Sequence, residues 1–141
     1  MIRLIAVGKM KDRHYAALVE QYVKRIRPWA GLEIVEIKDQ GPEREAQVMI
    51  ERIGPSEHVV AMDERGETLT SRELGGLLAI FGSPTFLIGG PDGLGDKVRR
   101  RADLTLSLST MTFPHELARL MLVEQIYRGL AINRGHAYHR D

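Results

Sequence analysis

The sequence predicts an α/β fold in which helices cover both faces of a parallel-rich sheet. Short apolar segments alternate five times with segments whose apolar residues recur at the i, i+3, i+4, i+7 spacing of a helix. Such alternation is typical of parallel strands joined by crossover helices. The length of 141 residues suits one domain, 1–141, because two halves would be too small for good cores.

Five strands are expected, and helix signals fill the intervals between them. The strands lie at residues 2–7, 32–37, 58–62, 85–88 and 104–108. Asp12 is placed to cap the first helix, which Pro28 ends. Pro42 opens the second helix, which stops at Gly54.

The second half of the chain continues the pattern. Thr70 and Glu73 have capping-box spacing at the start of a helix that ends at Gly82. A short segment around 97–102 follows the fourth strand, and Pro114 opens a last helix that runs to about residue 132. Residues 63–66, Asp-Glu-Arg-Gly, are expected to form a turn after the third strand.

Three segments are candidates for ligand binding, because ligands bind beyond the carboxyl ends of parallel strands. They are residues 63–66, 89–95 and 109–114. The loop Gly-Gly-Pro-Asp-Gly-Leu-Gly at 89–95 allows close backbone approach to a ligand, although glycines also serve ordinary tight turns. It is neither a P-loop nor a dinucleotide fingerprint. The hydroxyl-rich segment 107–112 is suited to enclosing an adenine, or simply to capping the next helix.

Composition restricts the class of protein. The chain is 43% hydrophobic and 28% charged, and no apolar run approaches the roughly 18 residues of a membrane span. The absence of cysteine excludes disulfides and thiolate metal sites and fits a cytoplasmic protein. His136 and His139 lack a third ligand at helical spacing, so no metal is expected. No Ser-His-Asp order supports hydrolysis, which favours a ligand that carries its own reactive group.

The net charge of +1 gives no general signal for nucleic acid, but the charge is uneven. A solvated face is the simple interpretation of each basic cluster, whereas two clusters joined in a dimer would attract phosphates. The clusters are Lys97, Arg99, Arg100 and Arg101, and then Arg128, Arg134 and Arg140 with two histidines.

The last helix is apolar around most of its circumference, which indicates burial on all sides. A partner subunit would cover it most simply, and a homodimer is therefore favoured over a helix that is merely central to one chain. Leu122 and Ile126 are candidate outward positions. The apolar residues are Leu117, Leu120, Met121, Leu122, Val123, Ile126, Tyr127, Leu130, Ala131 and Ile132.

Several longer motifs resemble the SPOUT-class rRNA methyltransferases of the RlmH type, which methylate N3 of a pseudouridine in the large-subunit rRNA. The matching segments are LIGGPDGLG, SLSTMTFPHELARLMLVEQIYRGLAI and HAYHRD, with IRLIAVGKMKD and VVAMDERG earlier in the chain. The resemblance covers essentially the whole sequence. Met62, Asp92 and Ala137 depart from the family's usual leucine, glutamate and proline.

The resemblance implies a C-terminal trefoil knot, a homodimer built around the last helix, and S-adenosylmethionine as cofactor. It implies action on 23S rRNA in assembled ribosomes, without a metal or a membrane. The implied cofactor pocket comprises Met62, Asp63, Gly89, Gly90, Leu108, Ser109, Thr110, Met111, Thr112, Phe113 and Pro114.

The C-terminal tail is expected to serve catalysis and RNA rather than folding. His139 is the candidate base that takes the imide proton, with Tyr138 for stacking and Arg140 for phosphate or carbonyl contact. Contacts to RNA are expected from Arg128, Arg134 and His136. The alternative for the tail is a frayed terminus. For the whole protein, the alternatives are an inactive ribosome- or RNA-binding relative of the same fold and a SPOUT methyltransferase for another RNA site.

Overall fold

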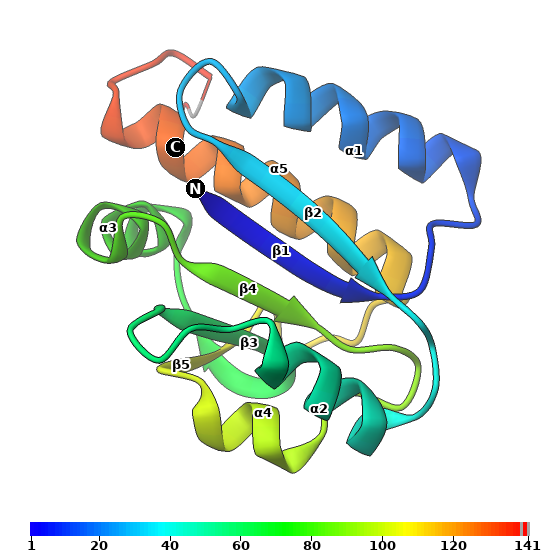
Figure 1. Ribbon diagram of the computed structural model, residues 1–141. Coiled ribbons are helices and arrows are strands. Elements are labelled where there is room, and N and C mark those ends of the chain that lie inside the picture. Colours follow the sequence, from blue (N-terminus) through cyan, green and yellow to red (C-terminus); the bar gives the residue numbers. More distant parts are fainter. Residues whose placement is uncertain (139, 141) are drawn as a thin grey trace.

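The computed structural model describes residues 1–138 and 140, and within them one five-stranded sheet in the order β2-β1-β4-β3-β5 (Figure 1). Every neighbouring pair of strands is parallel, which confirms the predicted α/β class. The strands are β1 Ile2–Val7, β2 Leu32–Ile37, β3 Val59–Thr68, β4 Thr85–Ile88 and β5 Leu104–Ser107.

Helices cover both faces of this sheet, as predicted. On one face α5 lies between α1 and α3, while α2 packs against α4 on the other (Figure 1). Interior strand β1 is apolar except for Arg3 because it serves both layers: Ile2 and Leu4 join the α1–α3–α5 core, and Ile5 and Val7 join the α2–α4 core. The helices are α1 Arg13–Ile26, α2 Pro42–Glu51, α3 Ser71–Phe81, α4 Asp96–Arg101 and α5 His115–Asn133.

The predicted helix starts are confirmed at atomic detail. The Asp12 carboxylate accepts hydrogen bonds from the backbone N–H groups of His14 and Tyr15 at 2.8 and 3.3 Å. Thr70 and Glu73 form the reciprocal capping box, at 3.1 and 2.8 Å. The trefoil knot implied by the resemblance stays a prediction.

The predicted turn at residues 63–66 is wrong. These residues belong to β3, which continues to Thr68, although its pairing with β5 shifts register between Met62 and Glu67. The segment is polar because it bulges from the ladder beyond the covered part of the sheet. Gly66 brings β3 back to β5, since a Cβ there would lie 2.6 Å from the Thr105 carbonyl oxygen.

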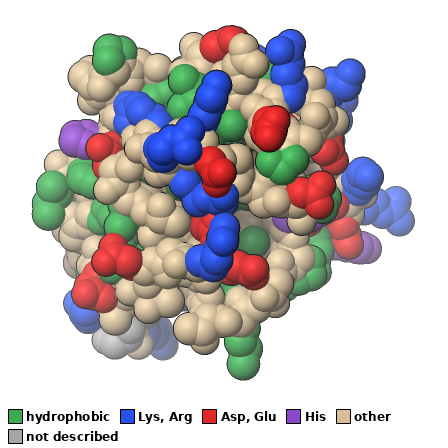
Figure 2. Space-filling model, turned by 90° about the horizontal axis from the view of Figure 1, so that it is seen from below, with side chains coloured by type: hydrophobic (Ala, Val, Ile, Leu, Met, Phe, Trp, Pro, Cys, Tyr) green, Lys and Arg blue, Asp and Glu red, His purple; other side chains and the backbone are tan. Residues whose placement is uncertain are grey.

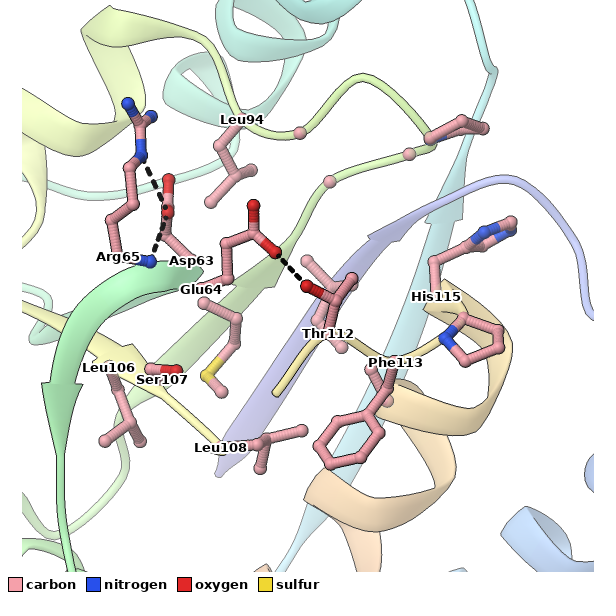
Figure 3. Close-up of a pocket in the computed structure, with 18 of the residues that line it drawn as sticks. Asp63, Glu64, Arg65, Leu94, Leu106, Ser107, Leu108, Thr112, Phe113 and His115 are labelled. Atoms are coloured by element: carbon pink, nitrogen blue, oxygen red, sulfur yellow. Dashed lines mark hydrogen bonds and ion pairs between the residues drawn. The ribbon is translucent and has the colours of Figure 1, made fainter. Parts of the chain in front are cut away.

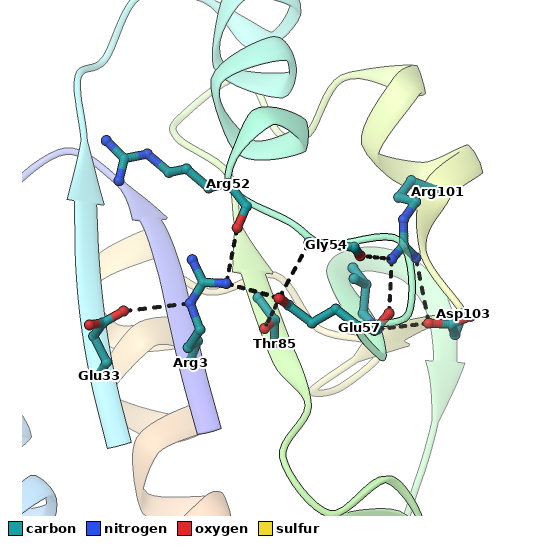
Figure 4. A network of polar contacts seen from close by, with 9 residues as sticks. Arg3, Glu33, Arg52, Gly54, Glu57, Thr85, Arg101 and Asp103 are labelled. Atoms are coloured by element: carbon teal, nitrogen blue, oxygen red, sulfur yellow. Dashed lines mark hydrogen bonds and ion pairs between the residues drawn. The ribbon is translucent and has the colours of Figure 1, made fainter. Parts of the chain in front are cut away.

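The amino ends of the strands are closed by a polar network centred on Glu57 (Figure 4). Its carboxylate accepts hydrogen bonds from Arg3 of β1 and from the buried Thr85 hydroxyl of β4. Arg101 of α4 donates to the carbonyl oxygens of Gly54 and Glu57, at 3.0 and 2.8 Å. This edge of the sheet is therefore filled, and the opposite, carboxyl edge is the one that carries a cavity.

Most of helix α5 is buried within one chain. Leu122 and Ile126 are fully buried, so neither is the outward position considered from the sequence. The stripe that faces away from the sheet includes the half-buried Leu117 and Met121. A central position between α1 and α3 thus accounts for much of the apolar pattern, and the homodimer remains a prediction. Within residues 1–138 and 140, no helix is both long and apolar enough to span a bilayer.

Candidate cofactor site

A cavity of about 750 Å³ lies where β3, β4 and β5 end and α5 begins (Figure 3). Its walls come from the bulged part of β3, the glycine-rich loop, the loop after β5 and the first turn of α5. All three segments predicted from strand ends therefore meet at one place. Of the residues expected to hold a cofactor, all line this cavity except Thr110.

The glycine-rich loop is both a tight turn and a wall of the cavity. The Gly93 N–H donates to the Gly90 carbonyl at 3.0 Å, and Gly93 has a φ of +79°. An added side chain would not fit at Gly89, where a Cβ would lie 2.6 Å from the Gly93 carbonyl carbon, and it would be tight at Gly90, where a Cβ would lie 3.0 Å from Val7 Cγ1. The two interpretations of this loop are thus compatible, because the turn itself exposes backbone to the cavity.

The loop after β5 is folded by its own hydroxyl groups. The Ser107 hydroxyl donates to the Ser109 carbonyl at 2.6 Å, and the Ser109 hydroxyl accepts from the Met111 N–H at 3.0 Å. The Thr112 hydroxyl reaches across to the Glu64 carboxylate of β3, at 2.9 Å (Figure 3). Phe113 and Pro114 follow this loop directly before α5 and also line the cavity.

An arginine pair fixes the carboxylate of Asp63, whose side chain is only 8% exposed. Arg99 donates to it at 2.9 Å, and Arg65 donates from both its backbone and its side chain. Burial alone would raise the pKa of Asp63, but the hydrogen bonds from Arg65 and Arg99 outweigh it, and the pKa lies below its usual value. Asp63 is therefore an anion at neutral pH.

The basic cluster at 97–101 is only partly free. Arg99 also bonds to Asp96, which raises the pKa of Arg99 and lowers that of Asp96, and Arg101 belongs to the network at the amino edge. Figure 2 shows the face that carries α2 and α4, where acidic and basic side chains are interspersed. Arg99 and Arg101 are thus engaged in structural contacts, while Lys97 and Arg100 are exposed, so the interpretation as a solvated face holds for two of the four residues.

The first turns of α5 also hold the loop that follows β1. Glu116 accepts hydrogen bonds from the N–H groups of Lys11 and Asp12, both at 3.0 Å. The buried Arg119 donates to the carbonyls of Val7 and Gly8 and pairs with a carboxylate of β2. These contacts fix the end of α5 that lines the cavity.

The C-terminal tail lies at the other end of α5, against α1 (Figure 1). The Tyr138 hydroxyl donates to Glu124 at 2.7 Å and lies 3.2 Å from the Tyr22 hydroxyl, and its ring packs edge-on against Tyr127. Burial, followed by these hydrogen bonds, raises the pKa of Tyr138. Tyr138 therefore has a packing role, so the tail also serves the fold, which was not expected from the sequence; its role in catalysis and RNA binding stays a prediction.

The other predicted tail residues make contacts of their own. Arg128 pairs with Glu124 and lies over the Tyr138 ring, and Arg134 donates to the Trp29 carbonyl at 2.8 Å. His136 packs edge-on against Trp29. Arg140 is exposed, and His139 lies outside the described residues. Among residues 1–138 and 140, no group of three potential metal ligands occurs.

Some cavity residues were absent from the predicted set. Glu64 and Arg65 belong to the candidate segment 63–66, but they and Ser107 were not in the pocket implied by the resemblance. Arg99 was considered in the sequence only as part of a basic cluster, and His115, the first residue of α5, also lines the cavity. For Glu64, Arg65 and Ser107, the position next to predicted residues at the ends of strands was the signal that could have placed them in the cavity. The remaining lining residues are Ile88, Pro91, Asp92, Gly93, Leu94, Leu106 and Ala118.

A parallel sheet with such a cavity at its carboxyl edge defines an α/β protein that binds a small ligand in loops after the strands. The chain matches, over residues 1–139, the family model described as "Predicted SPOUT methyltransferase". It therefore belongs to the SPOUT methyltransferase family.

Relatives match along nearly their whole length. A "Ribosomal RNA large subunit methyltransferase H" from Symbiobacterium thermophilum is 44% identical, over 99% of each chain. One of the same name from Parasynechococcus marenigrum is 45% identical over 98% of this chain and 95% of its own. Another, from Gloeobacter violaceus, is 38% identical over 98% and 97%.

Solved structures support the fold. A tRNA methyltransferase from Aquifex aeolicus matches with a TM-score of 0.58 and 16% identity, over 90% of this chain and 69% of its own. A probable methylase family protein from Haemophilus influenzae matches with a TM-score of 0.59 and 10% identity, over 95% and 68%. At these identities the likeness concerns the fold alone.

Proposed function

We propose that this chain is an S-adenosylmethionine-dependent methyltransferase that modifies N3 of a pseudouridine in 23S rRNA on assembled ribosomes. The observation that carries the proposal is one cavity built from the three strand-end segments, in a chain whose full-length relatives are named large-subunit rRNA methyltransferases. Ribosomes are cytoplasmic, and so is the protein on this proposal.

The lining of the cavity fits this cofactor. Its volume of about 750 Å³ is within the usual range for small-molecule sites. Leu94, Leu106 and Phe113 offer apolar surface for an adenine, and the glycine loop offers backbone groups. Three carboxylates and two guanidinium groups line the cavity, so its balance is negative, as a cationic ligand requires. These charged residues are Asp63, Glu64, Asp92, Arg65 and Arg99.

Positioning is the main task of the chain's own residues in this mechanism. When bound, S-adenosylmethionine supplies the methyl group. Glu116 and Arg119 hold the start of α5, and Arg65 and Arg99 hold Asp63, so the walls around the ligand are set before it arrives. Rigid walls keep the two reacting molecules aligned.

A base must take the imide proton of the pseudouridine, and His139 is the proposed residue. Any tyrosine keeps its proton at neutral pH, and burial raises the pKa of Tyr138 further, so Tyr138 is not the base and its proposed role is stacking. Replacing His139 by alanine should slow methyl transfer, typically by 10²–10⁴-fold for a general base. Raising the pH should partly restore the rate as the imide ionises unaided.

A homodimer would explain how the tail serves a cavity at the opposite end of α5. The helix has 19 residues, so its ends are about 28 Å apart. If the α5 helices of two copies run antiparallel, the tail of one copy lies toward the cavity of the other. Leu117 and Met121 of α5, with the 42%-exposed Leu18 of α1, are the proposed apolar contacts. Arg128, Arg134 and His136 would then face RNA near that composite site.

The test is methylation of purified ribosomes and of free rRNA by the purified protein, with the modified nucleotide mapped by mass spectrometry. We expect one methyl group on a pseudouridine of 23S rRNA, and only on assembled ribosomes. Methylation elsewhere would identify a SPOUT enzyme for another site. Binding to ribosomes without any methylation would identify an inactive relative.

A further inference from the structure

Two carboxylates that line the cavity, those of Glu64 and Asp92, have no cationic partner among the described residues. Glu64 lies in the bulged part of β3 and lines the cavity, and its carboxylate accepts a hydrogen bond from the Thr112 hydroxyl (Figure 3). Within residues 1–138 and 140, it makes no ion pair with lysine, arginine or histidine. A neutral hydroxyl leaves the full negative charge in place.

The neighbouring carboxylate differs in this respect. Asp63 is bonded to both Arg65 and Arg99, so its charge is compensated where it stands. Asp92, in the glycine-rich loop, is exposed like Glu64 and lines the same cavity, but among residues 1–138 and 140 it makes no side-chain hydrogen bond that would hold its carboxylate in place. Glu64 is therefore the unpaired carboxylate of the cavity whose position is held by a hydrogen bond.

We propose that Glu64 makes this site prefer the cationic cofactor over its demethylated product. The inference rests on the proposed function. S-adenosylmethionine carries a sulfonium, whereas S-adenosylhomocysteine has a neutral thioether and is otherwise the same molecule. A carboxylate in the cavity lowers the free energy of the charged ligand and has no such effect on the neutral one. The product then leaves more readily, and it inhibits the enzyme less.

The test is calorimetric titration of the full-length protein with three ligands. They are S-adenosylmethionine, S-adenosylhomocysteine and sinefungin, an analogue with an amine in place of the methylated sulfonium. Glu64→Gln keeps the size of the side chain and an acceptor for Thr112 but removes the charge. Because the Glu64 carboxylate is exposed, we expect S-adenosylmethionine and sinefungin to bind this variant roughly three- to fivefold more weakly than they bind the wild type. The affinity for S-adenosylhomocysteine should change less than about twofold. Added salt should reduce the wild-type preference.

Two control variants separate charge from geometry. Glu67→Gln removes the same charge from the same strand but outside the cavity lining, so the preference should persist. Thr112→Val removes the hydrogen bond and leaves the charge, so the preference should also persist, even if all three affinities fall. Loss of the preference in either control would overturn the role of the Glu64 charge.

The remaining outcomes are distinct. If Glu64→Gln lowers the affinity for all three ligands equally, or for none of them, the inference is overturned while the proposed function stands. If the wild-type protein binds none of the three, the proposed function fails, and this inference with it.

Discussion

The carboxylate of Asp63 is nearly buried and depends on charge-assisted hydrogen bonds. We expect Asp63→Asn to lower the free energy of unfolding at neutral pH by about 1–2 kcal/mol, because bonds from Arg99 and Arg65 to an anion become bonds to a neutral amide. Urea denaturation of the wild type and the variant measures the difference.

The pH dependence of that difference has a definite sign. The pKa of Asp63 in the folded protein is lowered from 3.8, so its contribution is complete above that value and is lost as the pH falls through the folded-state pKa. The difference in free energy of unfolding between the wild type and Asp63→Asn should stay constant from neutral pH to about pH 4 and become smaller in stronger acid. A gap that widens on acidification would contradict this account.

The Tyr138 hydroxyl links the tail to two helices through Tyr22 and Glu124. We expect Tyr138→Phe to destabilise the fold by about 1 kcal/mol, as seen by thermal or urea denaturation. Tyr15→Phe is the matched control, since the Tyr15 hydroxyl has no hydrogen-bond partner within residues 1–138 and 140. Equal stability of both variants with the wild type would mean that the tail does not dock.

At the scale of elements, the sequence predicts well wherever local chemistry decides. The ends of β1, β2 and β4 follow from short apolar runs bounded by polar or glycine residues, and two helix starts follow from Asp12 and Thr70. The sequence fails at β3, because pairing with β5 keeps a polar segment extended where composition alone suggests a turn. Which side of α5 faces the sheet was equally undecided, since that helix has no wholly polar face.

Helices α3 and α5 approach closely through glycines. A Cβ on Gly129 would lie 2.9 Å from Leu78 Cδ1 and 3.3 Å from the Gly75 Cα atom. We expect Gly129→Val to destabilise the protein by about 1–3 kcal/mol through overpacking. Gly76→Ala in α3, where a Cβ meets nothing within 4 Å, should instead stabilise it by about 0.5–1 kcal/mol. Denaturant unfolding measures both changes in the free energy of unfolding, and we expect a decrease for Gly129→Val and an increase for Gly76→Ala.

At the scale of the whole molecule, the proposed dimer predicts a particular sensitivity. Met121→Glu places a charge on the half-buried outer stripe of α5 and should shift the protein toward a 15.9 kDa monomer that is still folded. Light scattering measures the mass, and circular dichroism checks the fold. Ile80→Glu on α3 is the control, because Ile80 is 81% exposed and off this stripe. A wild-type protein that is monomeric at micromolar concentration would exclude the dimer.

The hydrogen bonds that join Glu116 and Arg119 of α5 to the loop after β1 also determine when folding can be completed during synthesis. Glu116 and Lys11 are 105 residues apart, and Arg119 and Gly8 are 111 apart. A nascent chain can pair β1 with β2 early, because few residues separate them, but it lacks one wall of the cavity until α5 has left the ribosome. Ligand binding is therefore one of the last properties that the growing polypeptide acquires, because α5 supplies both a wall of the cavity and the middle of one hydrophobic core.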